Sequence, residues 1–133
     1  MRIELLMAIF LLAAPISVLA ACSDQSDHSL QRKCLEQKEA ALSSHIRASE
    51  DIIRARISGW DQEPQYKSDA LALFNSASEK FRSFMTAQCN FEASSAAGGN
   101  GAGDMRLGCR ISLSERYLGS LKAQAARFSP PHA

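Results

Sequence analysis

A periodic run of apolar residues after Pro64 most strongly constrains the fold of this 133-residue chain. Its apolar members return at steps of three and four residues: Tyr66, Ala70, Phe74, Ala77, Phe81 and Phe84. This spacing lines one side of an α-helix with apolar groups. Pro64 suits the first position of that helix, where its missing N–H costs nothing. We therefore predict a helix from Pro64 to about Cys89 that buries its aromatic side chains.

A second helical pattern precedes this run, from Leu30 to about Ser58. Charged residues, including Glu50 and Arg54 as an i, i+4 pair, fill its polar positions. Gly59 ends the helix, and a turn follows. Four aliphatic residues share the apolar face through spacings of four and seven: Leu42, Ile46, Ile53 and Ile57. Because the connection is short, the two amphipathic helices predict an antiparallel hairpin, with the aromatics of the second packed on the first.

The rest of the chain predicts a loop, a third helix and a tail. The segment 93–104 is rich in glycine, serine and alanine, so it has little apolar surface to offset its ordering entropy and predicts a mobile loop. A third helix is expected from near Ser112, because Ser112 and Glu115 have capping-box spacing. Residues 128–133, with two prolines, form a flexible tail. The expected buried face of the third helix holds Leu113, Tyr117, Leu118, Leu121 and Ala125. No strand pattern competes with this all-α fold.

The N-terminal segment has the order of a signal peptide. Arg2 is followed by an apolar run from Leu5 to Leu19, and small residues come next. The run is shorter than the roughly 20 residues that cross a bilayer as a helix. We therefore predict that residues 1–21 direct export and that residues 22–127 fold as one domain outside the cytoplasm.

The cysteines all follow this segment, at Cys22, Cys34, Cys89 and Cys109. An oxidising compartment lets them form disulfides. Four cysteines permit three pairings, and spacing alone does not choose among them. Cys22 also ends a lipobox, Leu19-Ala20-Ala21-Cys22, in which it would carry a lipid. Ordinary cleavage after Val18-Leu19-Ala20 would instead leave its thiol free to pair, so both alternatives stand at this point.

The charge composition and the motifs exclude several classes of function. Lys+Arg 15 against Asp+Glu 14 gives a formal net charge of +1, with both signs interspersed. Without a basic stripe, nucleic acid is not expected as a partner. The histidines His28, His45 and His132 lack the spacing of metal ligands. With no catalytic set, metal site or cofactor motif, we expect a protein that is not an enzyme.

A string of residues in the second half of the chain carries a family resemblance: Cys89-Asn90-Phe91-Glu92, Gly98-Gly99, Met105, Cys109, Leu113 and Arg116, up to Leu118 or Leu121. It resembles the lysozyme inhibitor LprI-like family of bacterial envelope proteins. In that family a long helix ends at a cysteine, a Gly-Gly loop follows, and a second cysteine precedes a helix carrying an arginine. The chain departs from the pattern at Phe81, which stands for a tryptophan, and at Met85 and Thr86, which replace an Arg-Asp pair.

The resemblance implies a helical envelope domain whose named activity is binding and inhibiting lysozyme. It implies a Cys22–Cys34 disulfide, from the separation of two early cysteines. The spacing of Cys89 and Cys109 also fits, and a disulfide there would close the glycine-rich loop and stabilise the fold by about 3 kcal/mol. A lipidated Cys22 would instead leave Cys34 unpaired, and Ser23 would direct the lipoprotein to the outer membrane. In both cases we expect a periplasmic protein, soluble or lipid-anchored.

Two functions are compatible with these sequence features. A lysozyme inhibitor must plug a glycan cleft lined by carboxylates, and Arg106 and Arg110, beside the predicted loop, are the candidate binding residues. The near-neutral chain, however, gains no electrostatic steering towards basic lysozymes. The alternative is a non-catalytic binding or structural module of the envelope that serves another partner.

Overall fold

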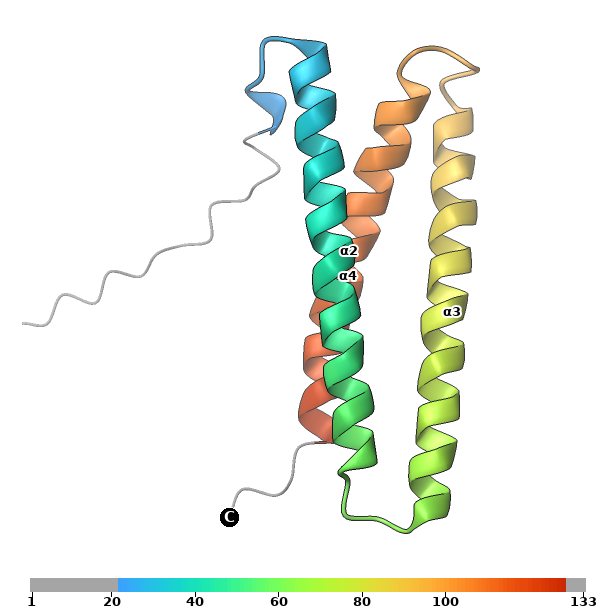
Figure 1. Cartoon of the computed structure of the whole chain (residues 1–133). Coiled ribbons are helices and arrows are strands. Elements are labelled where there is room, and N and C mark those ends of the chain that lie inside the picture. Colours follow the sequence, from blue (N-terminus) through green and yellow to red (C-terminus); the bar gives the residue numbers. More distant parts are fainter. Residues whose placement is uncertain (1–21, 129–133) are drawn as a thin grey trace, which may run out of the picture.

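The computed structural model describes residues 22–128, which form three long helices: α2 (His28–Ser58), α3 (Pro64–Ser94) and α4 (Ala102–Arg127). In Figure 1, α2 and α3 run in opposite directions, and α4 lies behind them and runs in the same direction as α2. The predicted all-α fold, a helical hairpin with a third helix and two disulfides, is confirmed. No helix in residues 22–128 is long and apolar enough to cross a membrane. The predicted signal peptide, residues 1–21, lies outside the described residues.

α2 has the bounds and the buried face that the sequence predicts, within two residues. The side chain of Asp27 caps its N-terminus by accepting a hydrogen bond of 2.9 Å from the Ser29 N–H. At the other end, the Gly59 N–H donates to the Ala55 carbonyl at 3.0 Å. The predicted face is largely buried, with Leu42 half-buried and three isoleucines in the core: Ile46, Ile53 and Ile57.

α4, and not α3, covers most of the inner face of α2. Leu121 of α4 is fully buried and completes one core cluster with the three isoleucines of α2. α4 also packs against α3, whereas α2 and α3 contact each other at few positions. The main apolar burial therefore joins the first and last helices of the chain, and this burial provides most of the driving force for folding.

The prediction that the aromatic stripe of α3 packs on α2 holds only for part of the stripe: Ala70 and Phe74 pack against the core cluster that contains the three isoleucines of α2. Tyr66 and Phe84 keep 55% and 54% of their area exposed. Phe81 stacks instead on Tyr117 of α4, with ring centroids 3.8 Å apart. α4 lies on the inner side of the hairpin, and the stripe residues that point away from both α2 and α4 stay exposed.

The predicted loop and the start of the third helix are also corrected. α3 continues beyond Cys89 to Ser94, and α4 begins at Ala102, well before Ser112. Only the segment 95–101 remains as a turn region between the helices.

Burial explains these additional helical turns. Ala93, at the start of the predicted loop, is 2% exposed, and Ile111, just before the predicted start of the third helix, is fully buried, so both flanks are part of the packed bundle. This packing offsets the cost of Gly103 and Gly108, each about 1 kcal/mol relative to alanine inside a helix. Gly98 lies in the remaining turn at φ 79°, a left-handed conformation that favours glycine.

Both disulfides that the family resemblance implies are present, Cys22–Cys34 and Cys89–Cys109, and none of the cysteines in residues 22–128 is free. Cys22 and Cys89 are each 1% exposed. The Cys22 sulfur is thus bonded to Cys34, as in the disulfide alternative. Two disulfides indicate an oxidising compartment.

Phe128 corrects the start of the predicted tail. Its ring meets Trp60, at the corner between α2 and α3, edge-on with centroids 5.2 Å apart. It also packs against the core cluster that contains Leu121. The ordered part of the chain therefore extends through Phe128, and the remainder of the predicted tail, residues 129–133, lies outside the described residues.

Candidate functional site

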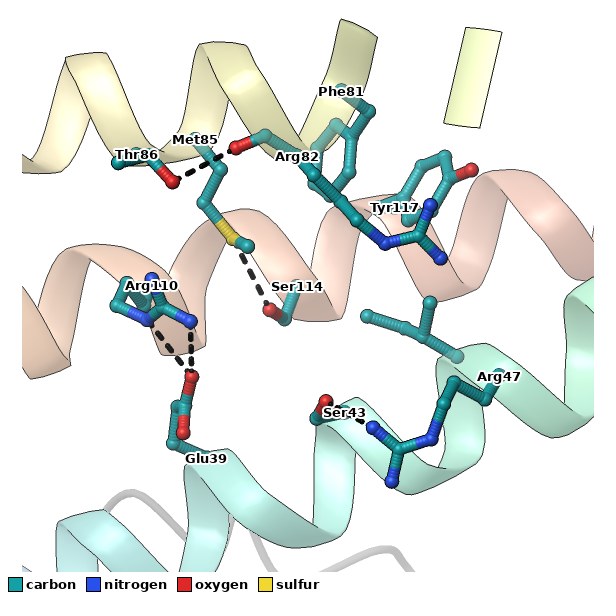
Figure 2. A pocket seen from close by; sticks show the side chains of 11 residues that line it. Glu39, Ser43, Arg47, Phe81, Arg82, Met85, Thr86, Arg110, Ser114 and Tyr117 are labelled. Carbon is teal, nitrogen blue, oxygen red and sulfur yellow. Dashed lines mark hydrogen bonds and ion pairs between the residues drawn. The ribbon is translucent and has the colours of Figure 1, made fainter. Parts of the chain in front are cut away.

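A cleft of about 310 Å³ opens between α2 and α3, with α4 as its floor (Figure 2). Its position follows from the packing, because α4 contacts both outer helices while these contact each other little. Its volume lies at the lower end of the range of small-molecule sites. The lining residues are Glu39, Ser43, Ile46 and Arg47 on α2, Phe81, Arg82, Met85 and Thr86 on α3, and Arg110, Ser114 and Tyr117 on α4.

The lining has an apolar part and a polar part. Phe81 and Tyr117 form the stacked pair at one end, and Ile46 and Met85 add aliphatic surface. The Ser114 hydroxyl lies 3.6 Å from the Met85 sulfur. The cleft therefore offers hydroxyl groups and guanidinium groups beside an apolar surface, a combination that orients a ligand with both characters.

A buried carboxylate lies beside the aromatic end of the cleft. The Glu50 side chain is 2% exposed, and Arg82 donates to its Oε2 at 2.5 Å. The Tyr117 hydroxyl donates to Oε1 at 3.1 Å, and Arg54 lies 3.7 Å from Oε2. The sequence predicts the i, i+4 pair with Arg54 correctly but places Glu50 on the polar face, where it is not. Packing of the other two helices encloses this carboxylate.

Tyr117 connects all three helices through its hydroxyl group. Besides Glu50 on α2, it contacts Ser78 on α3, whose Oγ lies 3.1 Å from the phenol oxygen. Burial raises the pKa of Tyr117 above its ordinary value of 10.0, and the nearby carboxylate of Glu50 raises it further. The phenol is consequently neutral at physiological pH and serves as a hydrogen-bond donor.

The three guanidinium groups of the cleft differ in their partners. Arg82 pairs with Glu50, and Arg110 pairs with Glu39, whose Oε1 lies 2.8 Å from Nε and 2.7 Å from Nη2. Arg47 donates from Nη1 to the Ser43 hydroxyl at 3.0 Å and makes no ion pair within residues 22–128. Arg47 thus brings an uncompensated positive charge to the cleft, and an anionic group on a ligand is favoured there.

The two arginines that the sequence singles out do not form one site. Arg110 lines the cleft but is engaged with Glu39 of α2. Arg106 lies outside the cleft and donates from Nε to Asn90 of α3 at 2.8 Å. Arg116, which carries part of the family resemblance, is exposed on α4 and does not line the cleft.

The sequence does not predict that the cleft residues form one site, because they belong to three helices that are far apart in the chain. In the sequence, Arg47 is one of several charged residues on the polar positions of α2, and Arg82 belongs to no motif. One sequence signal does find part of the cleft, since Phe81, Met85 and Thr86 are the positions at which the chain departs from the family pattern.

Outside the cleft, a second hollow of the described chain lies between α2 and α4, and its lining holds no carboxylate or histidine: Ser49, Ile52, Arg56, Leu121, Lys122, Ala125 and Ala126. Within residues 22–128, no group of three His, Cys, Asp or Glu side chains is placed to hold a metal ion. His28 lies beside Asp104 at 2.5 Å on the surface, and His132 falls outside the described residues. No protein-family model, no curated protein and no solved structure matches the chain.

Proposed function

We propose that the protein is an exported, non-catalytic binding module that holds a carboxylate of its ligand in the cleft between α2 and α3. The observation that carries this proposal is the position of Arg47. It lines the cleft with a guanidinium that is hydrogen-bonded to a hydroxyl group only, whereas the other two guanidiniums of the cleft are already paired with carboxylates. Guanidinium and carboxylate form strong, charge-assisted hydrogen bonds, often two at once.

The rest of the lining supports a ligand that carries apolar groups beside its carboxylate. Ile46, Met85 and the face of Phe81 lie next to the arginines, and Ser114 and Thr86 add hydroxyl groups. The cleft is too small for a folded protein, so a short peptide or the peptide stem of a cell-wall fragment is the ligand class of the right size. Export to the periplasm, with removal of residues 1–21, brings the protein to such ligands.

Titration with soluble peptidoglycan fragments tests this function, with backbone amide NMR shifts as the readout. Shifts are expected at Arg47, Phe81 and Ser114, and amidation of the free carboxylates of the fragments should abolish them. Arg47→Gln should weaken binding by about tenfold or more, the effect of losing one charge-assisted hydrogen bond. Arg116→Gln is the matched control, because Arg116 is an exposed arginine outside the cleft. Equal loss in both variants, or no shifts in the cleft, would contradict the proposal.

Processing is tested separately by the intact mass of the exported protein before and after reduction. Removal of residues 1–21 and a mass change for two disulfides are expected. A mass increase for a lipid, with a single disulfide, would instead support the lipoprotein alternative at Cys22.

Lysozyme inhibition, which the family resemblance implies, is a second candidate. One observation favours it: the turn region 95–101 joins α3 and α4 at one end of the bundle, and the exposed Arg106 lies next to it. Lysozyme clearing of a cell-wall suspension should slow in the presence of the protein, and Arg106→Ala should relieve this inhibition more than Arg116→Ala. Unaltered clearing at high molar excess would exclude the activity.

A further inference from the structure

α3 carries a second apolar face that the described chain leaves exposed. Its four large members are Tyr66, Leu73, Phe84 and Phe91, with 55%, 72%, 54% and 73% of their areas exposed. They are separated by 7, 11 and 7 residues, which are close to whole numbers of helical turns, so they line up along one side of α3. In Figure 1, α3 stands at the outer edge of the bundle, apart from α2.

This outer stripe is distinct from the face of α3 that packs on α4. The inward-facing residues Ser78, Met85, Cys89 and Ala93 are buried and lie between about a third and a half of a turn around the helix from the stripe. The stripe also shares no residue with the cleft. Between its large members lie Ala70, Ala77, Lys80 and Ala87, so its steps alternate between four and three residues. Ala70 stands at the inner edge of the stripe, because it also packs against the core cluster that contains Leu121. That alternation is the spacing of a seam that packs along another helix.

The large residues of the outer stripe have the same spacing whether they are counted from the N-terminal or the C-terminal end of α3. Tyr66 and Phe91 are equally far from the midpoint of the stripe, which lies between residues 78 and 79, and so are Leu73 and Phe84. If a second α3 is laid antiparallel on the first, each large residue meets another large residue. Such a pattern is self-complementary about a two-fold axis, as a symmetric dimer interface requires.

The smaller positions fit the same arrangement. Ala70 meets Ala87 of the other copy, and both side chains are small enough to allow close approach of the helices. Ala77 meets Lys80, the one charged member of the stripe. The small partner leaves space for the alkyl part of Lys80 to lie along the seam while its ammonium group reaches water. No two like charges are brought face to face in these layers.

From this pattern we infer that a second copy of this chain covers the outer stripe, through antiparallel pairing of the two α3 helices. A whole aromatic side chain has an area of roughly 150–250 Å². The four exposed fractions therefore leave on the order of 500 Å² of apolar surface per chain. Complete burial in both copies would remove on the order of 1,000 Å², about the minimum for a specific interface. The dimer leaves the cleft between α2 and α3 open, so it is independent of the proposed ligand.

Sedimentation equilibrium of the exported, disulfide-bonded protein tests the pairing, with the N-terminus of every variant verified by intact mass. The wild-type protein should be a dimer. Leu73→Glu and Phe84→Lys should each dissociate it, weakening association by about 100-fold or more because the change occurs twice in a symmetric dimer. Both residues are exposed in the monomer, so the helical circular dichroism should not change. Ile52→Glu, at a residue of α2 that is 51% exposed, is the control and should leave the dimer intact.

Mixing the two dissociated variants tests the register. In the antiparallel pairing, Glu at position 73 of the first variant faces Lys at position 84 of the second. In the other layer, the native Phe84 of the first variant faces the native Leu73 of the second. The mixture should therefore form a heterodimer. A parallel pairing would set position 73 against position 73 and give no such recovery. A monomeric wild type, a dimer that survives Leu73→Glu, or a mixture that stays monomeric would each overturn the inference.

Discussion

The buried ion pair between Glu50 and Arg82 allows a quantitative test of how the three helices are joined. Removing one partner of a buried ion pair generally costs about 3–5 kcal/mol, because the other charge is left without compensation. Here Arg82 is 49% exposed, and Arg54 and the Tyr117 hydroxyl still contact Glu50 after its removal. We therefore expect Arg82→Leu to lower the free energy of unfolding by a smaller amount, about 2–3 kcal/mol.

The double variant Glu50→Leu/Arg82→Leu should recover most of this loss, because replacing both charges with apolar groups is often close to neutral. The predicted coupling energy between the two sites is about 2 kcal/mol. Urea unfolding followed by helical circular dichroism, with both disulfides intact, measures each value. Arg116→Leu, an exposed control, should stay within about 0.5 kcal/mol of wild type. A loss below about 0.5 kcal/mol for Arg82→Leu, or a double variant as unstable as the sum of its singles, would refute the reasoning.

Three further predictions concern pH, a disulfide and the α3–α4 turn. Because burial raises the pKa of Tyr117, the folded protein keeps the phenol proton at a pH where the unfolded chain, with a pKa of about 10, has released it. The stability that this proton contributes is present below about pH 10 and is lost above it, so urea unfolding at stepped alkaline pH should show a steeper decline for wild type than for Tyr117→Phe. Cys89→Ser/Cys109→Ser should lower the free energy of unfolding by about 3 kcal/mol through loss of the loop constraint, measured by the same assay; an unchanged value would contradict this. Gly98→Ala should cost about 1 kcal/mol because the residue has φ 79°, whereas Gly101→Ala, at φ −74°, should cost less; thermal unfolding of the pair checks it.

α3 and α4 contribute different surfaces to the bundle. α4 supplies the internal packing surface for both other helices, and its inner residues are among the most buried in the described chain. α3 contributes one wall of the cleft and, on another side, the outer stripe. The proposed ligand site and the proposed dimer seam can therefore be altered independently, which makes the two proposals experimentally separable.

Local patterns predicted the elements of this fold well where a single helix determines the outcome. The stop at Gly59 and the start at Pro64 follow from backbone chemistry, and Ile46, Ile53 and Ile57 face the core because spacing alone places them on one side. Composition alone predicts too long a loop at 93–104, because it does not report the burial of Ala93 and Ile111. A glycine destabilises a helix by only about 1 kcal/mol, and the free energy gained by tertiary packing exceeds that cost in this segment.

The sequence by itself therefore determined that the chain forms amphipathic helices, and the resemblance anticipated which cysteines pair. Only the tertiary structure decided which apolar face is buried. Tyr66, Phe74, Phe81 and Phe84 share the helical periodicity of one apolar run, yet the structure covers some and leaves others exposed. The physical reason is that periodicity reports the faces of one helix, whereas burial depends on where a second helix lies. α4 lies on the inner side of the hairpin. Its packing there encloses Glu50, forms the floor of the cleft beside Arg47 and leaves the outer stripe exposed.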